Sequence, residues 1–176
     1  MARITIYDGD APSQDFTVSN TETFVPGAEI EILAGYHSDE TSIFTGIIVK
    51  HSIKISRNRS PLLILDCRDK AVKMTVARKN KYFYDKKDSE AAEEIISPYS
   101  LDHDIEDTKV QLQSIVQYNS TDWDFMVSRM EANGKLCMVK DGKITAKKPD
   151  FSSSTVLDTV FGDTMLEFDA DLDARN

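Results

Sequence analysis

The sequence predicts an α+β fold that is mainly β, with an antiparallel, barrel-like β domain, short connecting helices and a β-hairpin. Apolar residues repeat with a period of two through the first 77 positions, between clusters of turn-forming residues. Two capped stretches with helical spacing follow, and a later Asp141-Gly142 dipeptide joins two apolar runs, as in a tight hairpin. With 40% hydrophobic and 29% charged residues, the chain of 176 residues has the composition of a soluble globular protein.

The β region contains a long strand, expected from Ile43 to Ile55. Gly46, near its start, predicts a bulge or a close approach of another backbone segment. Strict alternation predicts one face made of Ile47, Val49, His51, Ile53 and Ile55, and an opposite face made of Ile48, Lys50, Ser52 and Lys54. Shorter strands are expected over 29–34 and 62–65, which gives a meander of antiparallel strands.

Two helices are expected between the β segments. The first begins with Asp88 as its N-cap and ends before Pro98. The second covers roughly residues 122 to 133, because Thr121 and Asp124 have the spacing of a capping box. Its apolar stripe consists of Trp123, Met126, Val127 and Met130. We expect Trp123 to be a core anchor.

The order of these elements predicts three regions. Residues 1–85 form a barrel-like β domain. Residues 86–155 form an α/β connecting region with two helices and a hairpin. Residues 156–176 begin a second β domain, because apolar and acidic residues alternate from Thr164 to Ala174 as in an amphipathic strand.

The charge balance argues against nucleic acid as a partner. The 21 basic and 30 acidic residues give a net charge of −9, which repels a phosphate backbone. The stretch Arg78 to Lys87 interleaves lysines with aromatic residues, a pattern that can mark a single-strand binding surface. In an acidic chain a solvated strand is the favoured interpretation. No apolar run is long enough to predict a membrane span.

The sequence predicts no catalytic, cofactor-binding or metal-ligating residue and no cofactor. His37, His51 and His103 lie far apart, and Cys67 and Cys137 are expected to be buried free thiols. Two groups of acidic residues bear on this prediction. Asp122 and Asp124 point to different sides of a helix, which disfavours a glycosidase pair. The cluster Asp102, Asp104, Glu106 and Asp107 lacks the pattern of a calcium loop, so a solvated acidic loop is favoured.

The segment from Gln117 to Phe125, continued by Arg129 and Gly134, resembles the signature of the VgrG spike proteins of type VI secretion and the phage late-control tail hub proteins. There, a Gln-aromatic pair precedes an acidic cap, an aromatic-rich helix, an arginine and a glycine. Phe44-Thr45-Gly46 and the short helix near 89–96 resemble upstream elements of that family. The residues of this structural motif are Gln117, Tyr118, Asp122, Trp123, Phe125, Arg129, Gly134, Phe44 and Gly46.

This resemblance implies a non-enzymatic hub of a phage-tail-like contractile injection machine, in which the chain is the first part of the hub module. Residues 1–85 would then be the tube domain of the hub, with its usual N-terminal strands expected to be missing. The full-length protein is then expected to be a homotrimer that joins a tail tube protein of the Hcp type to needle or tip components. It would be cytoplasmic when assembled and exported on firing. The alternatives are a cell-wall or carbohydrate-active domain carried by such a machine, and an unrelated β-rich binding module.

Overall fold

The structure, a computed structural model, describes residues 1–37 and 39–173. The strands are β1 (Ala2–Tyr7), β2 (Glu29–Tyr36), β3 (Asp39–Ser56), β4 (Arg59–Arg68), β5 (Arg78–Lys87), β6 (Asp102–Ile105), β7 (Gln111–Thr121), β8 (Leu136–Lys140) and β9 (Lys143–Lys147). The α-helices are α1 (Asp88–Ile96) and α2 (Asp122–Ala132), and the 3-10 helices are η1 (Glu22–Phe24), η2 (Lys70–Thr75) and η3 (Ser97–Tyr99).

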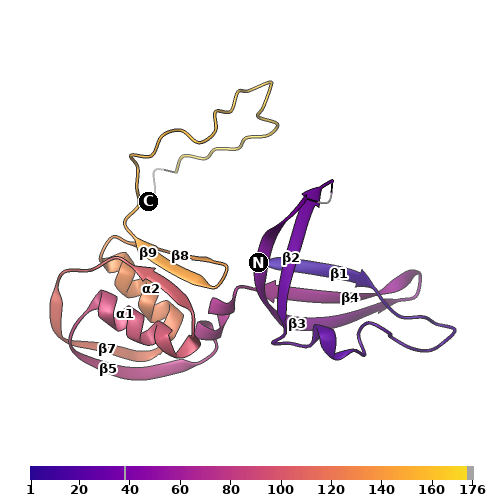
Figure 1. The fold of residues 1–176 in the computed structure, drawn as a ribbon, viewed down its shortest axis with the longest axis horizontal. Coiled ribbons are helices and arrows are strands. Elements are labelled where there is room, and N and C mark those ends of the chain that lie inside the picture. Colours follow the sequence, from indigo (N-terminus) through magenta and orange to yellow (C-terminus); the bar gives the residue numbers. More distant parts are fainter. Residues whose placement is uncertain (38, 174–176) are drawn as a thin grey trace.

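These elements form two lobes joined through η2 (Figure 1). The first lobe is an antiparallel sheet in the order β1-β4-β3-β2, and it is an open sheet in the part of the chain that the structure describes. In the second lobe, α1 and α2 lie between the two-stranded β5-β7 ribbon and the sheet β6-β9-β8. The predicted fold class, mainly β with short connecting helices and a hairpin, is confirmed. Strand β1, which the sequence analysis did not anticipate, pairs with β4 along its whole length.

The predicted faces of the long strand β3 need a correction at a bulge. The pairing of β3 with β4 shifts register between Ile48 and Lys50, so Val49 is the extra residue. Ile48 therefore shares the core face with His51 and is only 1% exposed, whereas Val49 is exposed. Gly46 fulfils its prediction of a close approach, because a Cβ there would lie 2.2 Å from the carbonyl oxygen of Arg68.

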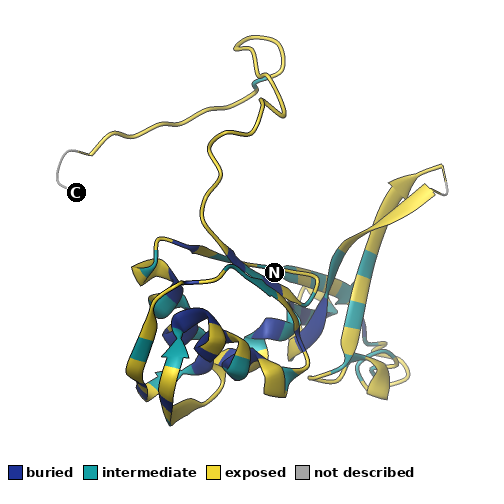
Figure 2. Ribbon diagram, turned by 60° about the vertical axis from the view of Figure 1, so that its left-hand side comes forward, coloured by how far each residue is buried: buried dark blue, intermediate teal, exposed yellow. Residues whose placement is uncertain are grey.

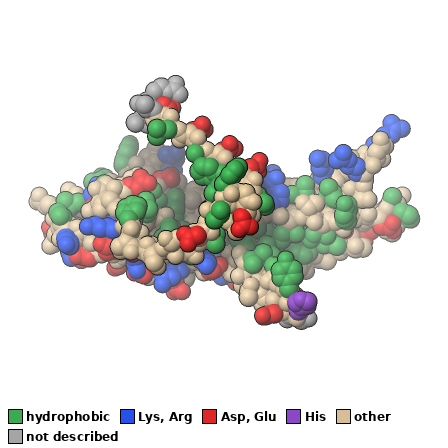
Figure 3. Space-filling view, turned by 90° about the horizontal axis from the view of Figure 1, so that it is seen from above, with side chains coloured by type: hydrophobic (Ala, Val, Ile, Leu, Met, Phe, Trp, Pro, Cys, Tyr) green, Lys and Arg blue, Asp and Glu red, His purple; other side chains and the backbone are tan. Residues whose placement is uncertain are grey.

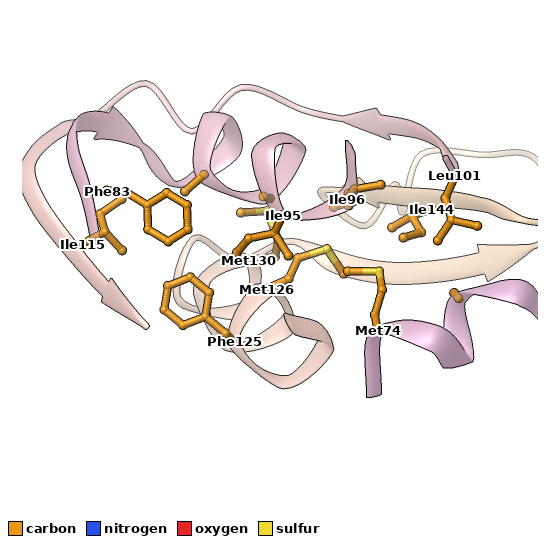
Figure 4. Close-up of a cluster of buried hydrophobic side chains, with 14 residues drawn as sticks. Met74, Phe83, Ile95, Ile96, Leu101, Ile115, Phe125, Met126, Met130 and Ile144 are labelled. Carbon is orange, nitrogen blue, oxygen red and sulfur yellow. The ribbon is translucent and has the colours of Figure 1, made fainter. Parts of the chain in front are cut away.

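The main core fills the second lobe, where the two helices meet both sheets (Figure 4). Phe125, Met126 and Met130 of α2 point into it, and the Phe125 ring stacks on Phe83 of β5 with centroids 6.0 Å apart. The first lobe has a smaller core, made of Ile48, Leu63, Leu65 and Cys67. Figure 2 shows the contrast, with buried residues gathered around the helices and along the middle of the first sheet.

Helix α2 matches the predicted range, and the Thr121 hydroxyl accepts a hydrogen bond from the Asp124 amide as its N-cap. Trp123, however, is only half-buried at the edge of the core. The stripe predicted from sequence missed Phe125, which is buried against β5 because the helix turns this side toward the ribbon. The first helix also differs slightly, since Lys87 rather than Asp88 occupies the N-cap position.

The predicted hairpin is present as β8 and β9. Asp141 and Gly142 both have positive φ angles, 52° and 76°, as a two-residue type I′ turn requires. The strand expected from Thr164 to Ala174 is absent through residue 173, and Ala174 lies outside the described residues. A strand needs a neighbour for its backbone groups, and within the described residues this segment has only an isolated bridge between Met165 and Phe161.

We expect Phe125→Ala to lower the free energy of unfolding by about 3–5 kcal/mol, because it empties a packed aromatic site. Trp123→Ala should cost clearly less, since that side chain is only partly buried at the edge of the core. Tyr118→Ala, at a 79% exposed position, is the control and should change stability by less than about 0.5 kcal/mol. Urea denaturation of the three variants measures this order, and a Trp123 variant as unstable as the Phe125 variant would contradict it.

Candidate functional site

The motif around the start of α2 builds a buried polar network. The Asp122 side chain, 5% exposed, accepts hydrogen bonds from Gln117 Nε2 at 2.8 Å, from Lys79 Nζ at 2.6 Å and from the Tyr99 hydroxyl at 2.7 Å. These donors come from β7, β5 and η3. One carboxylate therefore connects four elements of the second lobe.

The pKa of Asp122 reflects two opposing effects. Burial favours the neutral acid, but the hydrogen bonds from Gln117, Lys79 and Tyr99 outweigh burial and hold the pKa below its ordinary value of 3.8. The hydrogen bond between Lys79 and Asp122, together with the one between Lys79 and the Tyr99 hydroxyl, raises the pKa of Lys79. Asp122 is thus an ionised group that is fully engaged in hydrogen bonding, which suits a structural carboxylate better than a general acid or a nucleophile.

A second network locks the two helices together. Arg129 of α2 binds Asp88 of α1 in a bidentate manner, with Nε to Oδ1 at 2.6 Å and a terminal nitrogen to Oδ2 at 3.0 Å. Asn133 donates a further hydrogen bond to Asp88 Oδ2 at 2.9 Å. Asp88 is buried, so these donors compensate its loss of water.

The other motif residues are spread over the fold rather than gathered at one site. Tyr118 is exposed on the outer face of the ribbon, Gly134 has a positive φ of 65° just after α2, and Phe44 packs on the core of the first lobe. Thus Gln117 and Asp122 meet directly, whereas Phe44 and Gly46 belong to the other lobe. Sequence reasoning did not find Lys79, Tyr99 and Asn133, because no local pattern joins Lys79 to a carboxylate 43 positions away.

The lysines of β5 are engaged within the molecule. Lys79 binds Asp122, Lys81 and Lys86 both bind Glu94 of α1, and Lys87 binds Asp107 at 2.9 Å. The basic stretch is therefore a half-exposed strand, as favoured from the sequence, and its positive charge is offset by neighbouring carboxylates. A phosphate backbone would have to displace these ion pairs.

The acidic cluster also has internal partners. Residues 102–105 form strand β6 rather than the expected loop, and Asp104 binds Lys147 at 2.7 Å. Glu106 binds Lys135 at 2.9 Å, and Lys135 is itself only 2% exposed. Among residues 1–37 and 39–173, no group of three or more His, Cys, Asp or Glu side chains is placed to hold a metal ion.

His51, the two cysteines and one apolar hollow are the next groups to place. His51 is hydrogen-bonded to the Phe24 carbonyl oxygen at 3.0 Å. Cys67 is buried and Cys137 half-buried, and burial raises the pKa of both thiols, which lowers their reactivity. A shallow apolar hollow of about 250 Å³ lies beside Trp123 and Val139. In the described chain, no helix is long and apolar enough to cross a membrane.

The lowered pKa of Asp122 predicts a pH dependence of stability. The contribution of this carboxylate is fully present above its unfolded pKa near 3.8, and it is lost as the pH falls through the lower folded-state pKa. Asp122→Asn should therefore reduce stability at neutral pH by about 1–3 kcal/mol and flatten the decline below pH 4. Thermal unfolding of both proteins between pH 2 and 7 tests this. Parallel curves for wild type and variant would contradict it.

The bidentate contact predicts that lysine cannot replace Arg129. A lysine supplies one point charge in place of a planar fork, so Arg129→Lys should cost about 1–3 kcal/mol in unfolding free energy. Arg59→Lys, at the exposed first position of β4, serves as the matched control and should be neutral. Denaturation midpoints decide between these outcomes, and an Arg129 variant with the stability of the control would show that the fork contributes nothing.

Comparison with solved structures identifies the fold. The chain is similar to a 43 kDa tail protein of prophage MuSo2 from Shewanella oneidensis, with a TM-score of 0.61 and 13% identity over 82% of this chain and 43% of the other. It is also similar to a tail protein from Neisseria meningitidis, with a TM-score of 0.54 and 19% identity over 77% of this chain and 46% of the other.

A third similar structure is an Escherichia coli protein, c3393, described as a component of the type VI secretion system with structural similarity to the T4 bacteriophage tail proteins gp27 and gp5. The TM-score is 0.58, with 13% identity over 82% of this chain and 40% of that protein. The chain thus spans less than half the length of each of these three structures. At these identities the likeness shows a tail-protein fold and leaves the expected VgrG relationship as a hypothesis.

Comparison with curated protein sequences gives no significant match. A family model does match, and it covers residues 1–176, the whole sequence. It differs in name from the spike family that the motif resembles. By this match the chain belongs to the family described as the Alg8 N-terminal domain.

Proposed function

We propose that this chain is a structural hub component of a phage-tail-like contractile injection machine, the first part of a module that joins a tail tube to a needle. The likeness of its fold to a prophage tail protein, a second tail protein and a type VI secretion component carries the proposal. The relationship to the VgrG spike proteins, suggested by the segment from Gln117 to Phe125, belongs to the same proposal.

The chemistry of the motif supports a mechanical role. Its charged and amide side chains are used to connect elements, since Asp122 ties four of them together and Arg129 clamps α1 to α2. Buried charged hydrogen bonds of this kind resist relative movement of the elements they join. A hub that transmits force between a tube and a needle requires elements that are held rigidly together in this way.

The same contacts weigh against the alternative, a cell-wall or carbohydrate-active domain. A glycosidase places two carboxyl groups about 5–10 Å apart across a substrate cleft. Here Asp88 and Asp122 are buried and fully hydrogen-bonded, and Asp104, Glu106 and Asp107 are paired with lysines. We therefore propose that the chain has no enzymatic activity of its own.

The assembly expected from the resemblance is part of the proposal. The protein that carries this chain would be a homotrimer, with a tube protein of the Hcp type on one side and needle or tip components on the other. It would be cytoplasmic when assembled and exported on firing.

Association with particles tests the structural role. An affinity tag inserted at the exposed turn between β3 and β4, near Asn58, should copurify with tail or injection particles from the producing cell. Arg129→Asp should deplete the chain from particles, because the helix clamp is lost. A tagged protein that remains outside particles while the particles are complete would contradict the proposal.

The enzymatic alternative has its own test. The purified chain should release no product from peptidoglycan or soluble glycans. Turnover that a single Asp or Glu substitution abolishes, with folding retained, would overturn the non-enzymatic proposal.

A further inference from the structure

The 3-10 helix η2 joins the two lobes but is attached to the second one. Its Ala71 and Met74 are buried in the core of that lobe, at 5% and 0% exposed. The Asp69 carboxylate holds its start, since Oδ1 accepts a hydrogen bond from the Ala71 amide at 2.9 Å. The other oxygen, Oδ2, accepts one at 3.0 Å from the amide of Gly142 in the β8–β9 turn. Because it is fixed at both places, η2 moves with the second lobe.

Arg68, the residue before Asp69, is held equally firmly in the first lobe. It is the last residue of β4 and pairs with Ile47 of β3. Its carbonyl oxygen lies so close to Gly46 that a Cβ there would be 2.2 Å away. Its neighbour Cys67 is buried in the core of the first lobe. Two well-packed bodies therefore meet at the single peptide unit between Arg68 and Asp69.

Little else connects the two lobes, which Figures 1 and 3 show side by side along the long axis of the molecule. Each lobe has its own sheets and its own core. Between residues 1–37 and 39–68 on one side and residues 76–172 on the other, the described chain forms no hydrogen bond and no ion pair. Lobes without a large apolar interface are expected to move relative to each other.

One exposed ion pair spans the junction. Lys70 Nζ of η2 lies 2.6 Å from Glu29 Oε1 at the start of β2, and the two side chains are 31% and 73% exposed. An exposed pair of this kind contributes little and is screened by salt. It can favour one orientation of the lobes without locking them together.

A hollow lies beside the junction where the lobes do not pack. It has a volume of about 250 Å³, and its walls include Met1 and Arg68 from the first lobe and Trp123 and Val139 from the second. Side chains that face a void lose the contacts that would otherwise resist movement. A rotation at the junction would carry Met1 and Arg68 away from Trp123 without disturbing either core.

We propose that the peptide unit between Arg68 and Asp69 is a hinge about which the two lobes rotate as rigid bodies, with the ion pair between Glu29 and Lys70 favouring the orientation in Figure 1. Hinges are short segments between packed bodies that absorb the change in backbone angles. The internal contacts of the second lobe, including those of Asp122, stay intact during this motion. A partner that touches both lobes would then select one orientation from those already populated.

Distances between pairs of spin labels test the hinge. The pair across the junction is Thr5→Cys/Glu131→Cys, and the control pair within the second lobe is Ser114→Cys/Glu131→Cys, all at exposed positions. Both are made with Cys137→Ala, because Cys67 is fully buried and does not need replacement. Double electron–electron resonance should give a clearly broader distance distribution for the pair across the junction than for the control pair.

The ion pair predicts how that distribution responds. Lys70→Glu, or about 1 M salt, should change the ratio of the orientations by about two- to fivefold, the effect of losing one exposed ion pair. Glu29→Lys/Lys70→Glu restores opposite charges and should restore the wild-type distribution. The distances of the control pair should change in none of these cases.

The matched control variant is Arg3→Glu. It also replaces a cation of an exposed ion pair, the one with Asp66 at 2.6 Å, but both partners belong to the first lobe. It should leave the distribution across the junction as in the wild type, and circular dichroism melting curves should show that all variants remain folded. A distribution across the junction as narrow as that of the control pair, or equal responses to Arg3→Glu and Lys70→Glu, would overturn the inference. Neither result bears on the proposed structural role, which does not depend on the hinge.

Discussion

The second lobe depends on one buried carboxylate. Asp122 begins α2, and its oxygens receive donors from β5, β7 and η3, three elements that are distant from each other in sequence. A buried charge without partners would cost several kcal/mol, so this arrangement is stable only when all of these elements are in place. The carboxylate therefore makes correct assembly of the lobe nearly all-or-none. Its position at the N-terminus of α2 adds a favourable interaction with the helix dipole.

The bidentate contact between Asp88 and Arg129 adds α1 to the elements that Asp122 connects. Both helices begin with a buried aspartate whose partner lies on another element, and apolar side chains fill the space between them. Apolar packing alone can tolerate sliding of one helix over another, whereas a bidentate fork fixes their register. Gln117, Asp122 and Arg129 of the motif that resembles tail hub proteins thus connect secondary-structure elements to each other. Both charged residues, Asp122 and Arg129, are used for contacts between elements of the fold.

Local signals in the sequence predicted the elements well, and the contacts between distant segments escaped them. The cap at Thr121, the turn at Asp141-Gly142 and the close approach at Gly46 each depend on a few neighbouring residues, and the structure confirms all three. The bulge at Val49 could not be predicted from the sequence, because it depends on the register in which β3 pairs with β4. The partners of Asp122 could not be predicted either. Lys79 and Tyr99 become its hydrogen-bond donors only because the fold buries the carboxylate beside them. The domain boundaries proposed from the sequence stay predictions.

The distribution of charge links the rigid body to its surroundings. Lysines of β5, and Lys135 before β8, form ion pairs with carboxylates of the second lobe. The charges of that lobe therefore largely cancel each other. The described C-terminal residues 149–173 contain seven acidic and no basic residues, so much of the net charge of −9 lies outside this body. The basic residues of β5 therefore stabilise contacts within the second lobe and do not form a positive surface for an anionic partner.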